Sequence, residues 1–396
     1  MTFGMTMRTG LAALAVACLA GPVVAAPAKD ATKDSAKDVA KDVAKDSAKD
    51  SAKDSAKDSA KDSAKGDAAP LSAQAIRDAR FAEPGQDETA GGTKPSAAKA
   101  DDRPDPLTIK VQVLLDRARF FPGAIDGRNG ENLQGALSAY AVAQGLPPTK
   151  TLTKAVFDKL AATGGDPVVS DYTITEADAA GPYIDKIPAK MEAQADLDAM
   201  GYTDSREMLA ERFHMSRDLV SQLNPDKPLD KAGTVILVAG VQPMGLDKPM
   251  AKDLPRDPTV DRVEVDKGSR DVRAFDKAGK LLAYYPASIG SEEKPAPSGE
   301  TKVKGVAFDP SYTYDPKYRF KGVKTRKKFS IRPGPNNPVG LVWIDLAIPS
   351  YGIHGTPEPE KVGKTESHGC IRLTNWNARD LAAHVARGAK VSFKED

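Results

Sequence analysis

The sequence predicts a multidomain α+β protein whose C-terminal part is predominantly β. Three observations lead to this prediction. A four-residue repeat near the N-terminus is too polar to fold, apolar residues at helical spacing follow it, and alternating apolar residues dominate the last third of the chain. The chain has 396 residues, which suggests two or three domains, and about 290 residues remain for packed structure once the N-terminal hundred are set aside.

The composition excludes several protein classes. Hydrophobic residues make up 40% of the chain, charged residues make up 28%, and the formal net charge is +2. These values exclude a membrane-spanning bundle, a wholly disordered chain and a strongly basic nucleic-acid coat protein. Two cysteines exclude a disulfide-rich scaffold. The charge is uneven: residues 259–393 hold 23 Lys and Arg against 15 Asp and Glu, which favours an anionic partner.

Residues 1–26 have the pattern of a secretory signal peptide. One basic residue precedes an uncharged stretch from Leu11 to Ala20, and small residues follow at Val23–Ala26. The apolar run is too short to be a transmembrane segment. We therefore expect cleavage near Ala25 or Ala26 and export to the periplasm or cell envelope. An alternative is a lipid anchor at Cys18. If Cys18 leaves with the signal peptide, Cys370 is the only cysteine of the mature chain.

Residues 27–106 are predicted to be a disordered linker. From Lys29 to Lys65 the sequence mostly repeats Ser-Ala-Lys-Asp, with ten Lys, nine Asp and no aromatic residue. Such a segment buries too little apolar surface to offset the entropy of its chain. A single exposed helix is the alternative, since Asp and Lys three residues apart can pair, but Asp and Ser in the repeats disfavour a helix. We interpret the segment as a spacer that gives reach.

Residues 107–162 are predicted to form a small three-helix domain. Turn signals at Pro122-Gly123, Asp126-Gly127 and Gly145–Pro148 separate three groups of apolar residues, each on one helical face: Val111, Leu114 and Leu115; Leu133, Leu137 and Tyr140; Val156, Phe157 and Leu160. With its Asp-Gly turn, the layout resembles the helical peptidoglycan-binding domain of cell-wall enzymes. A wall-binding role is what the resemblance implies; the composition indicates only a helical bundle.

Residues 195–241 are predicted to form a second small module. We expect Ser205 to cap a first helix, a second helix to end at Asn224-Pro225, and residues 234–238 to form a strand. Two such helices also fit a DNA-binding helix-turn-helix. The second helix has little basic character and the chain is expected to be exported, so no nucleic-acid partner is predicted. The order resembles a LysM module, which binds glycan, although no clear strand precedes the first helix.

The segment 258–394 is predicted to be a β-rich domain with one helix. A hairpin turn at Asp276–Lys280 joins two alternating apolar stretches, and Val342–Leu346 forms another strand. The helix is expected from Asn375 to Arg387. Gly388 would end it, before a last strand at Lys390–Phe393.

Two histidines lie near Cys370 in this segment. His354-Gly355 precedes Ser367-His368-Gly369-Cys370 by twelve residues, and Arg372 follows. A cysteine nucleophile needs a base because only the thiolate attacks, and His354 and His368 are the two candidates. Backbone N–H groups at Gly369 and Cys370 could hold an oxyanion. One Cys and two His without CxxC or HxxxH spacing form an incomplete zinc site, so neither a metal nor a cofactor is predicted.

These residues resemble the signature of the L,D-transpeptidase catalytic domain (YkuD-like). The resemblance implies that Cys370 is the nucleophile and that His354 accepts and donates its proton. His368, Gly369 and Arg372 would position the acyl donor and stabilise the oxyanion, with Ser367 and Gly355 completing the substrate site. Some relatives have Ser where this chain has Gly355, and a backbone carbonyl could orient His354 in its place.

The resemblance also implies a reaction on peptidoglycan. The enzyme would transfer the acyl group of the third residue of a stem tetrapeptide to an amine, which gives 3→3 crosslinks or attaches a protein to the wall. The partners would be stem peptides and glycan, with a wall-anchored protein as a further acceptor. Two alternatives stay open: an L,D-carboxypeptidase that uses water, and a non-catalytic wall-binding structural protein.

Overall fold

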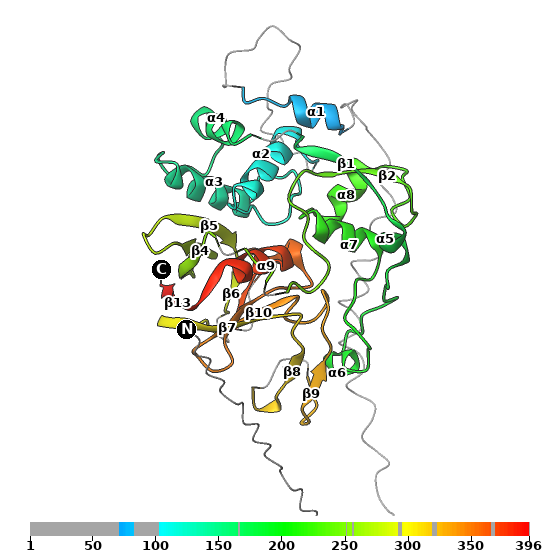
Figure 1. Cartoon of the computed structure of the whole chain (residues 1–396), viewed down its shortest axis with the longest axis vertical. Coiled ribbons are helices and arrows are strands. Elements are labelled where there is room, and N and C mark those ends of the chain that lie inside the picture. The colour runs from blue at the N-terminus through cyan, green and yellow to red at the C-terminus, as the bar shows by residue number, and fades with distance from the viewer. Residues whose placement is uncertain are drawn as a thin grey trace, which may run out of the picture. The chain divides into compact units, whose positions relative to one another are not determined.

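The computed structural model describes residues 71–82, 103–164, 167–250, 252–255, 257–291, 295–318, 323–365 and 369–395 (Figure 1). The predicted signal peptide lies outside these residues, and so does the predicted linker apart from 71–82 and 103–106. Within these ranges, no helix combines the length and the apolar character needed to cross a bilayer.

Helices occupy the first part of the described chain. The predicted apolar faces lie inside α2, α3 and α4 and are buried in one core together with Ile76 of α1. Side chains of Asp105 and Thr153 accept hydrogen bonds from the first turns of α2 and α4, which fixes where these helices begin. The helices are α1 (Ala73–Asp78), α2 (Pro106–Arg117), α3 (Glu131–Ala143) and α4 (Lys154–Ala162).

A two-stranded antiparallel sheet and two helices follow. Strand β1 pairs with β2 from Val169↔Ala239 to Thr173↔Val235. Residues 169–239 therefore form one unit, here called the β1–β2 module, which begins before the predicted boundary at residue 195 with a strand that the sequence did not indicate. Asp204, and not Ser205, caps α7, because its side chain accepts the N–H of Glu207. The elements are β1 (Val169–Thr173), α5 (Glu176–Ala180), α6 (Met191–Gln194), α7 (Ser205–Arg212), α8 (Arg217–Leu223) and β2 (Val235–Ala239).

The C-terminal part is built on a nine-stranded mixed sheet with the order β5-β4-β3-β13-β7-β10-β11-β12-β6. The predicted hairpin joins β4 and β5, and α9 packs in the same apolar core as the sheet (Figure 1). The strands are β3 (Val260–Asp266), β4 (Asp271–Phe275), β5 (Leu281–Pro286), β6 (Ser288–Ile289), β7 (Gly299–Phe308), β10 (Val342–Leu346), β11 (Gly352–His354), β12 (Ile371–Arg372) and β13 (Val385–Lys394).

Helix α9 (Asn375–His384) ends three residues earlier than the sequence predicts. Strand β13 begins at once with Val385, and its pairing with β3 shifts register between Val385 and Lys390. Gly388 lies within this irregularity at a φ of 90°, so the glycine serves a bulge in the strand and does not end the helix.

The helical part contacts the sheet directly at strand β5. The N–H of Phe121 donates to the carbonyl of Tyr284 (2.9 Å), and the N–H of Tyr284 donates to the carbonyl of Arg119 (3.0 Å). The ring of Phe121 stacks on Tyr285 with centroids 5.2 Å apart. Backbone pairing and ring stacking together hold the segment that follows α2 against this strand.

Candidate active site

Neighbouring strands bring the predicted base and nucleophile to the same region. Strands β11 and β12 are parallel, with Ile353 opposite Ile371 and His354 opposite Arg372. Both isoleucines are fully buried in the core that contains α9. Because side chains alternate along a strand, His354 and Arg372 lie on the other face. Cys370 directly precedes β12.

The ring of His354 is held in one orientation. Its Nδ1 lies 2.7 Å from the carbonyl oxygen of Gly355, which only accepts, so Nδ1 carries the proton and Nε2 keeps its lone pair in the neutral ring. Trp343 of β10 stacks on the ring with centroids 5.6 Å apart. The prediction that a backbone carbonyl orients His354 is confirmed.

Burial keeps His354 uncharged. Its side chain lies away from water, and the guanidinium of Arg372 is nearby. Burial first, and this positive charge second, lower the pKa of His354 to about 4, although the Gly355 hydrogen bond acts in the opposite direction. At neutral pH the ring is therefore uncharged, with Nε2 available to accept a proton.

Cys370 is half-buried and forms no disulfide with any residue that the structure describes. Its thiol donates to the carbonyl oxygen of Ser350, with 3.8 Å between sulfur and oxygen. Gly369 before it is buried and has a φ of 102°, a backbone conformation that L side chains rarely adopt. Tyr312 lies close enough to Cys370 to feel its charge, and burial and this charge raise the pKa of Tyr312 to about 12.

Arg372 is a partly buried cation two residues after Cys370. Burial lowers its pKa, while the charges of Glu358 and Cys370 act to raise it. Within the described part of the chain, its Nε is buried and meets no hydrogen-bond partner. An incoming oxyanion or carboxylate would satisfy such a donor.

Five of the seven predicted site residues lie in this region: Cys370, His354, Gly355, Gly369 and Arg372. Ser367 and His368 lie outside the described residues. Among the residues that the structure describes, no cluster of three or more His, Cys, Asp and Glu has a metal-binding arrangement.

Comparisons with known proteins point to the same segment. The family model for the L,D-transpeptidase catalytic domain, YkuD, matches residues 260–392. A Bacillus licheniformis protein named as the L,D-transpeptidase YkuD is 27% identical over 192 residues, which cover 48% of this chain and 93% of that relative. A Bacillus subtilis protein named as the L,D-transpeptidase YqjB is 30% identical over 166 residues, covering 41% of this chain and 82% of that relative. The chain belongs to the L,D-transpeptidase family.

Among solved structures, L,D-transpeptidase 3 from Mycobacterium tuberculosis is similar at 16% identity and a TM-score of 0.29, covering 41% of this chain and 76% of that chain. The match to the L,D-transpeptidase family model begins at residue 260. Helices α2–α4 and the β1–β2 module therefore lie outside it.

Three residues around the candidate site are not found from the sequence. Trp343 stacks on His354, Tyr312 lies near Cys370, and the buried amide of Asn375 accepts the N–H of Leu341. Each approaches from a different element, and the sequence pattern does not show which strands pair. Asn375 stands in the same block as Cys370, five residues later, which is the one signal that could have drawn attention to it.

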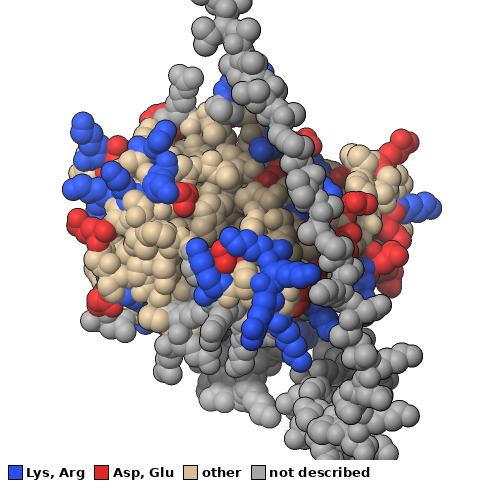
Figure 2. Space-filling model, turned by 90° about the horizontal axis from the view of Figure 1, so that it is seen from below, with Lys and Arg blue, Asp and Glu red and all other residues tan. Residues whose placement is uncertain are grey.

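A basic loop extends from the hairpin that carries Tyr312. Strand β8 (Tyr312–Tyr314) pairs with β9 (Phe329–Ile331), and the loop between them exposes Lys317, Lys324, Arg326, Lys327 and Lys328. Figure 2 shows Lys and Arg side chains gathered on the face that is seen from below. Asp315 pairs with Lys328 at 2.9 Å and offsets part of this charge.

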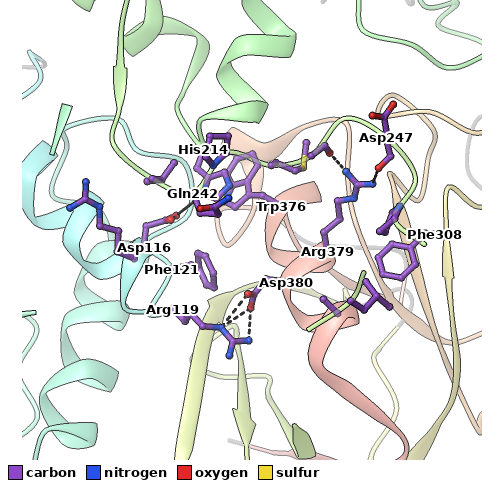
Figure 3. A pocket seen from close by; sticks show the side chains of 18 of the residues that line it. Asp116, Arg119, Phe121, His214, Gln242, Asp247, Phe308, Trp376, Arg379 and Asp380 are labelled. Atoms are coloured by element: carbon purple, nitrogen blue, oxygen red, sulfur yellow. Dashed lines mark hydrogen bonds and ion pairs between the residues drawn. The ribbon is translucent and has the colours of Figure 1, made fainter. Parts of the chain in front are cut away.

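A cavity of about 650 Å³ lies beside α9, and its lining includes neither Cys370 nor His354 (Figure 3). Several of its charged side chains pair with one another. Arg119 pairs with Asp380 at 2.8 Å, and Asp116 bonds to Nδ1 of His214, which stacks on Trp376. The cavity is a gap between packed modules that is separate from the candidate active site.

Proposed function

We propose that this protein is an exported peptidoglycan L,D-transpeptidase in which Cys370 is the nucleophile and His354 is the general base. One observation carries the proposal. The Gly355 carbonyl fixes the proton of His354 on Nδ1, so a buried neutral ring presents Nε2 as an acceptor on the strand next to the one that Cys370 precedes. A base of this kind is what a cysteine acyltransferase needs.

In the first half-reaction, Nε2 of His354 takes the thiol proton as the sulfur of Cys370 attacks the carbonyl carbon of the third residue of a stem tetrapeptide. Backbone N–H groups of Gly369 and Cys370, with Arg372 nearby, stabilise the oxyanion. Its collapse breaks the C–N bond. His354 gives its proton to the leaving nitrogen, D-alanine departs, and a thioester remains on Cys370.

In the second half-reaction, an amine attacks the thioester. His354 takes a proton from the amine and returns it to the sulfur, and an amide forms. A stem amine as acceptor gives a 3→3 crosslink, and a protein amine attaches that protein to the wall. Water in its place gives L,D-carboxypeptidase activity, which is the second candidate function, since the same residues serve both reactions.

In this proposal the remaining regions bring the catalytic domain to the cell wall. The signal peptide at 1–26 exports the chain, the linker at 27–106 gives reach, and the modules at 107–162 and 195–241 hold glycan. Ser367 and His368 help to position the acyl donor. The pairing of the segment after α2 with β5 supports this arrangement, because wall bound by the helical domain would stay close to the catalytic sheet.

Mass spectrometry of the intact protein with a carbapenem tests the nucleophile. We expect one acyl adduct on the wild type and none on Cys370→Ala, with equal thermal midpoints for the two proteins. The nucleophile is misassigned if both acquire the adduct. If neither does, the non-catalytic wall-binding reading is favoured.

Incubation with tetrapeptide-bearing muropeptides tests the acceptor. A transpeptidase produces 3→3 dimers, whereas a carboxypeptidase produces tripeptide monomers alone. Adding an unrelated amine at increasing concentration separates the two further, because only a transpeptidase forms an amide with it at the expense of the tripeptide.

A further inference from the structure

The amide of Asn375 is completely buried at the start of α9, beside the candidate active site. Its Oδ1 accepts the N–H of Leu341 at 3.0 Å. Its Nδ2 donates to both carboxyl oxygens of Glu211, at 3.0 and 3.1 Å, and lies 3.2 Å from the carbonyl of Pro335. Both ends of the amide are satisfied, so its orientation is fixed.

The oxygen of this amide lies directly against two glycine backbones. A Cβ added to Gly355 or to Gly340 would overlap Oδ1 of Asn375. Gly355 supplies the carbonyl that holds Nδ1 of His354. The side chain of Asn375 therefore packs against the backbone of the residue whose carbonyl orients His354.

Glu211 reaches Asn375 from outside the catalytic segment. It belongs to α7 of the β1–β2 module and is 3% exposed. Burial, with the charge of Glu207 one turn earlier, raises its pKa to about 8. Tyr202 donates to its Oε2 at 3.2 Å and Arg217 of α8 is nearby, while Arg379 of α9 lies near Tyr202.

We propose that Asn375 and Glu211 are positioning residues for His354. Glu211 holds the amide of Asn375, the amide fixes the backbone of Gly355, and the Gly355 carbonyl fixes the ring. In this arrangement the β1–β2 module completes the catalytic site in addition to any binding role. The inference rests on the proposed function, since it assigns a supporting structure to the general base.

Two measurements on the full mature chain test the inference. The first is the tautomer of His354, read from ¹⁵N chemical shifts of the imidazole. The second is the maximal rate of acylation of Cys370 by a carbapenem. We expect wild-type His354 to be protonated on Nδ1. In Asn375→Ala and Glu211→Ala, the other tautomer should appear and acylation should slow by about ten- to a hundredfold.

Two further variants separate positioning from folding. Glu211→Gln keeps an acceptor for the amide and should restore both readouts. Arg212→Ala, on the same helix, removes the 3.0 Å ion pair with Asp178 and a contact with Tyr172, but no contact with Asn375. It should lower the thermal midpoint without changing the tautomer.

An unchanged tautomer in Glu211→Ala, or the same loss in Arg212→Ala, would overturn the inference. If Asn375→Ala does not fold, Glu211→Ala gives the same readouts from the neighbouring module. The tautomer does not depend on catalysis. A wild type with the Nδ1–H tautomer that forms no muropeptide product therefore contradicts the proposed function and leaves this inference intact.

Discussion

The carbonyl oxygen of Gly355 accepts a hydrogen bond at 2.7 Å from Nδ1 of His354, the residue immediately before it. A main-chain group, and not a side chain, thus orients the ring. The orientation of the ring then depends on whatever holds the Gly355 backbone in place.

A side chain at position 355 should be poorly tolerated. We expect Gly355→Ser to destabilise the fold by about 1–3 kcal/mol, because its Cβ would overlap Oδ1 of Asn375. The same substitution should slow acylation at least as much as Asn375→Ala. Chemical denaturation and carbapenem acylation measure the two effects. Gly305→Ala in β7 is the matched control, since a Cβ there meets nothing within 4 Å. Equal losses in both variants would contradict this explanation.

The base should stay active well below neutral pH. His354 has a pKa of about 4, so the rate constant for acylation at low carbapenem concentration should change little between pH 7 and pH 5.5 in a stopped-flow measurement. A fall in this rate constant below pH 6.5 that only substitutions of His354 abolish would show that the ring is hydrated.

The same shift predicts how stability depends on pH. In the unfolded chain His354 takes up a proton as the pH falls through 6.5, whereas the folded ring stays neutral down to about 4. The free energy of unfolding should therefore decrease as the pH is lowered from 6.5 to about 4, by up to about 1.4 kcal/mol per pH unit. Urea denaturation at several pH values measures it. His354→Gln should flatten the curve there, and a parallel curve for the variant would refute the assignment.

Glu211 should act in the opposite direction at higher pH. Its carboxyl loses its proton near 4.5 when unfolded but holds it to about 8 when folded, so this contribution to stability is lost as the pH rises from 4.5 through 8. Glu211→Gln should be less sensitive to pH across that range. Urea denaturation of both proteins checks this, and an identical slope would show that Glu211 is already ionised at neutral pH.

The basic loop should steer anionic stem peptides. Replacing Lys324, Arg326 and Lys327 by Gln should raise the apparent KM for muropeptides at low salt, and the difference should shrink as salt is added. Lys277→Gln with Lys280→Gln, on the exposed β4–β5 turn, is the control. If the salt dependence of KM is the same in all three proteins, the loop has no steering role.

The chemistry of the site could be predicted because its residues lie close together in one block of sequence. His354, Gly355, Gly369, Cys370 and Arg372 span nineteen residues. The surroundings could not be predicted, since they depend on which segments pair. Trp343 reaches His354 through the pairing of β10 with β11, and Glu211 reaches Asn375 across 164 positions.

Local signals also misled at element ends. The periodic apolar residues of α9 continue to Val385, but strand pairing with β3 takes over at that residue. At α7, Asp204 and Ser205 are both good caps, and only the geometry selects the first. Strand β1 was missed because only Val169 of its five residues is buried, which leaves little alternation to read.

The pairing of Phe121 with Tyr284 has a consequence for cutting the chain. Strand β5 is the last strand on its side of the sheet, and the backbone around Phe121 occupies hydrogen-bonding groups there that would otherwise be free. A fragment that begins at Thr259 would expose the edge of the sheet at β5. Exposed edge strands promote self-association. Soluble fragments of this chain should therefore retain the residues from 103 onward.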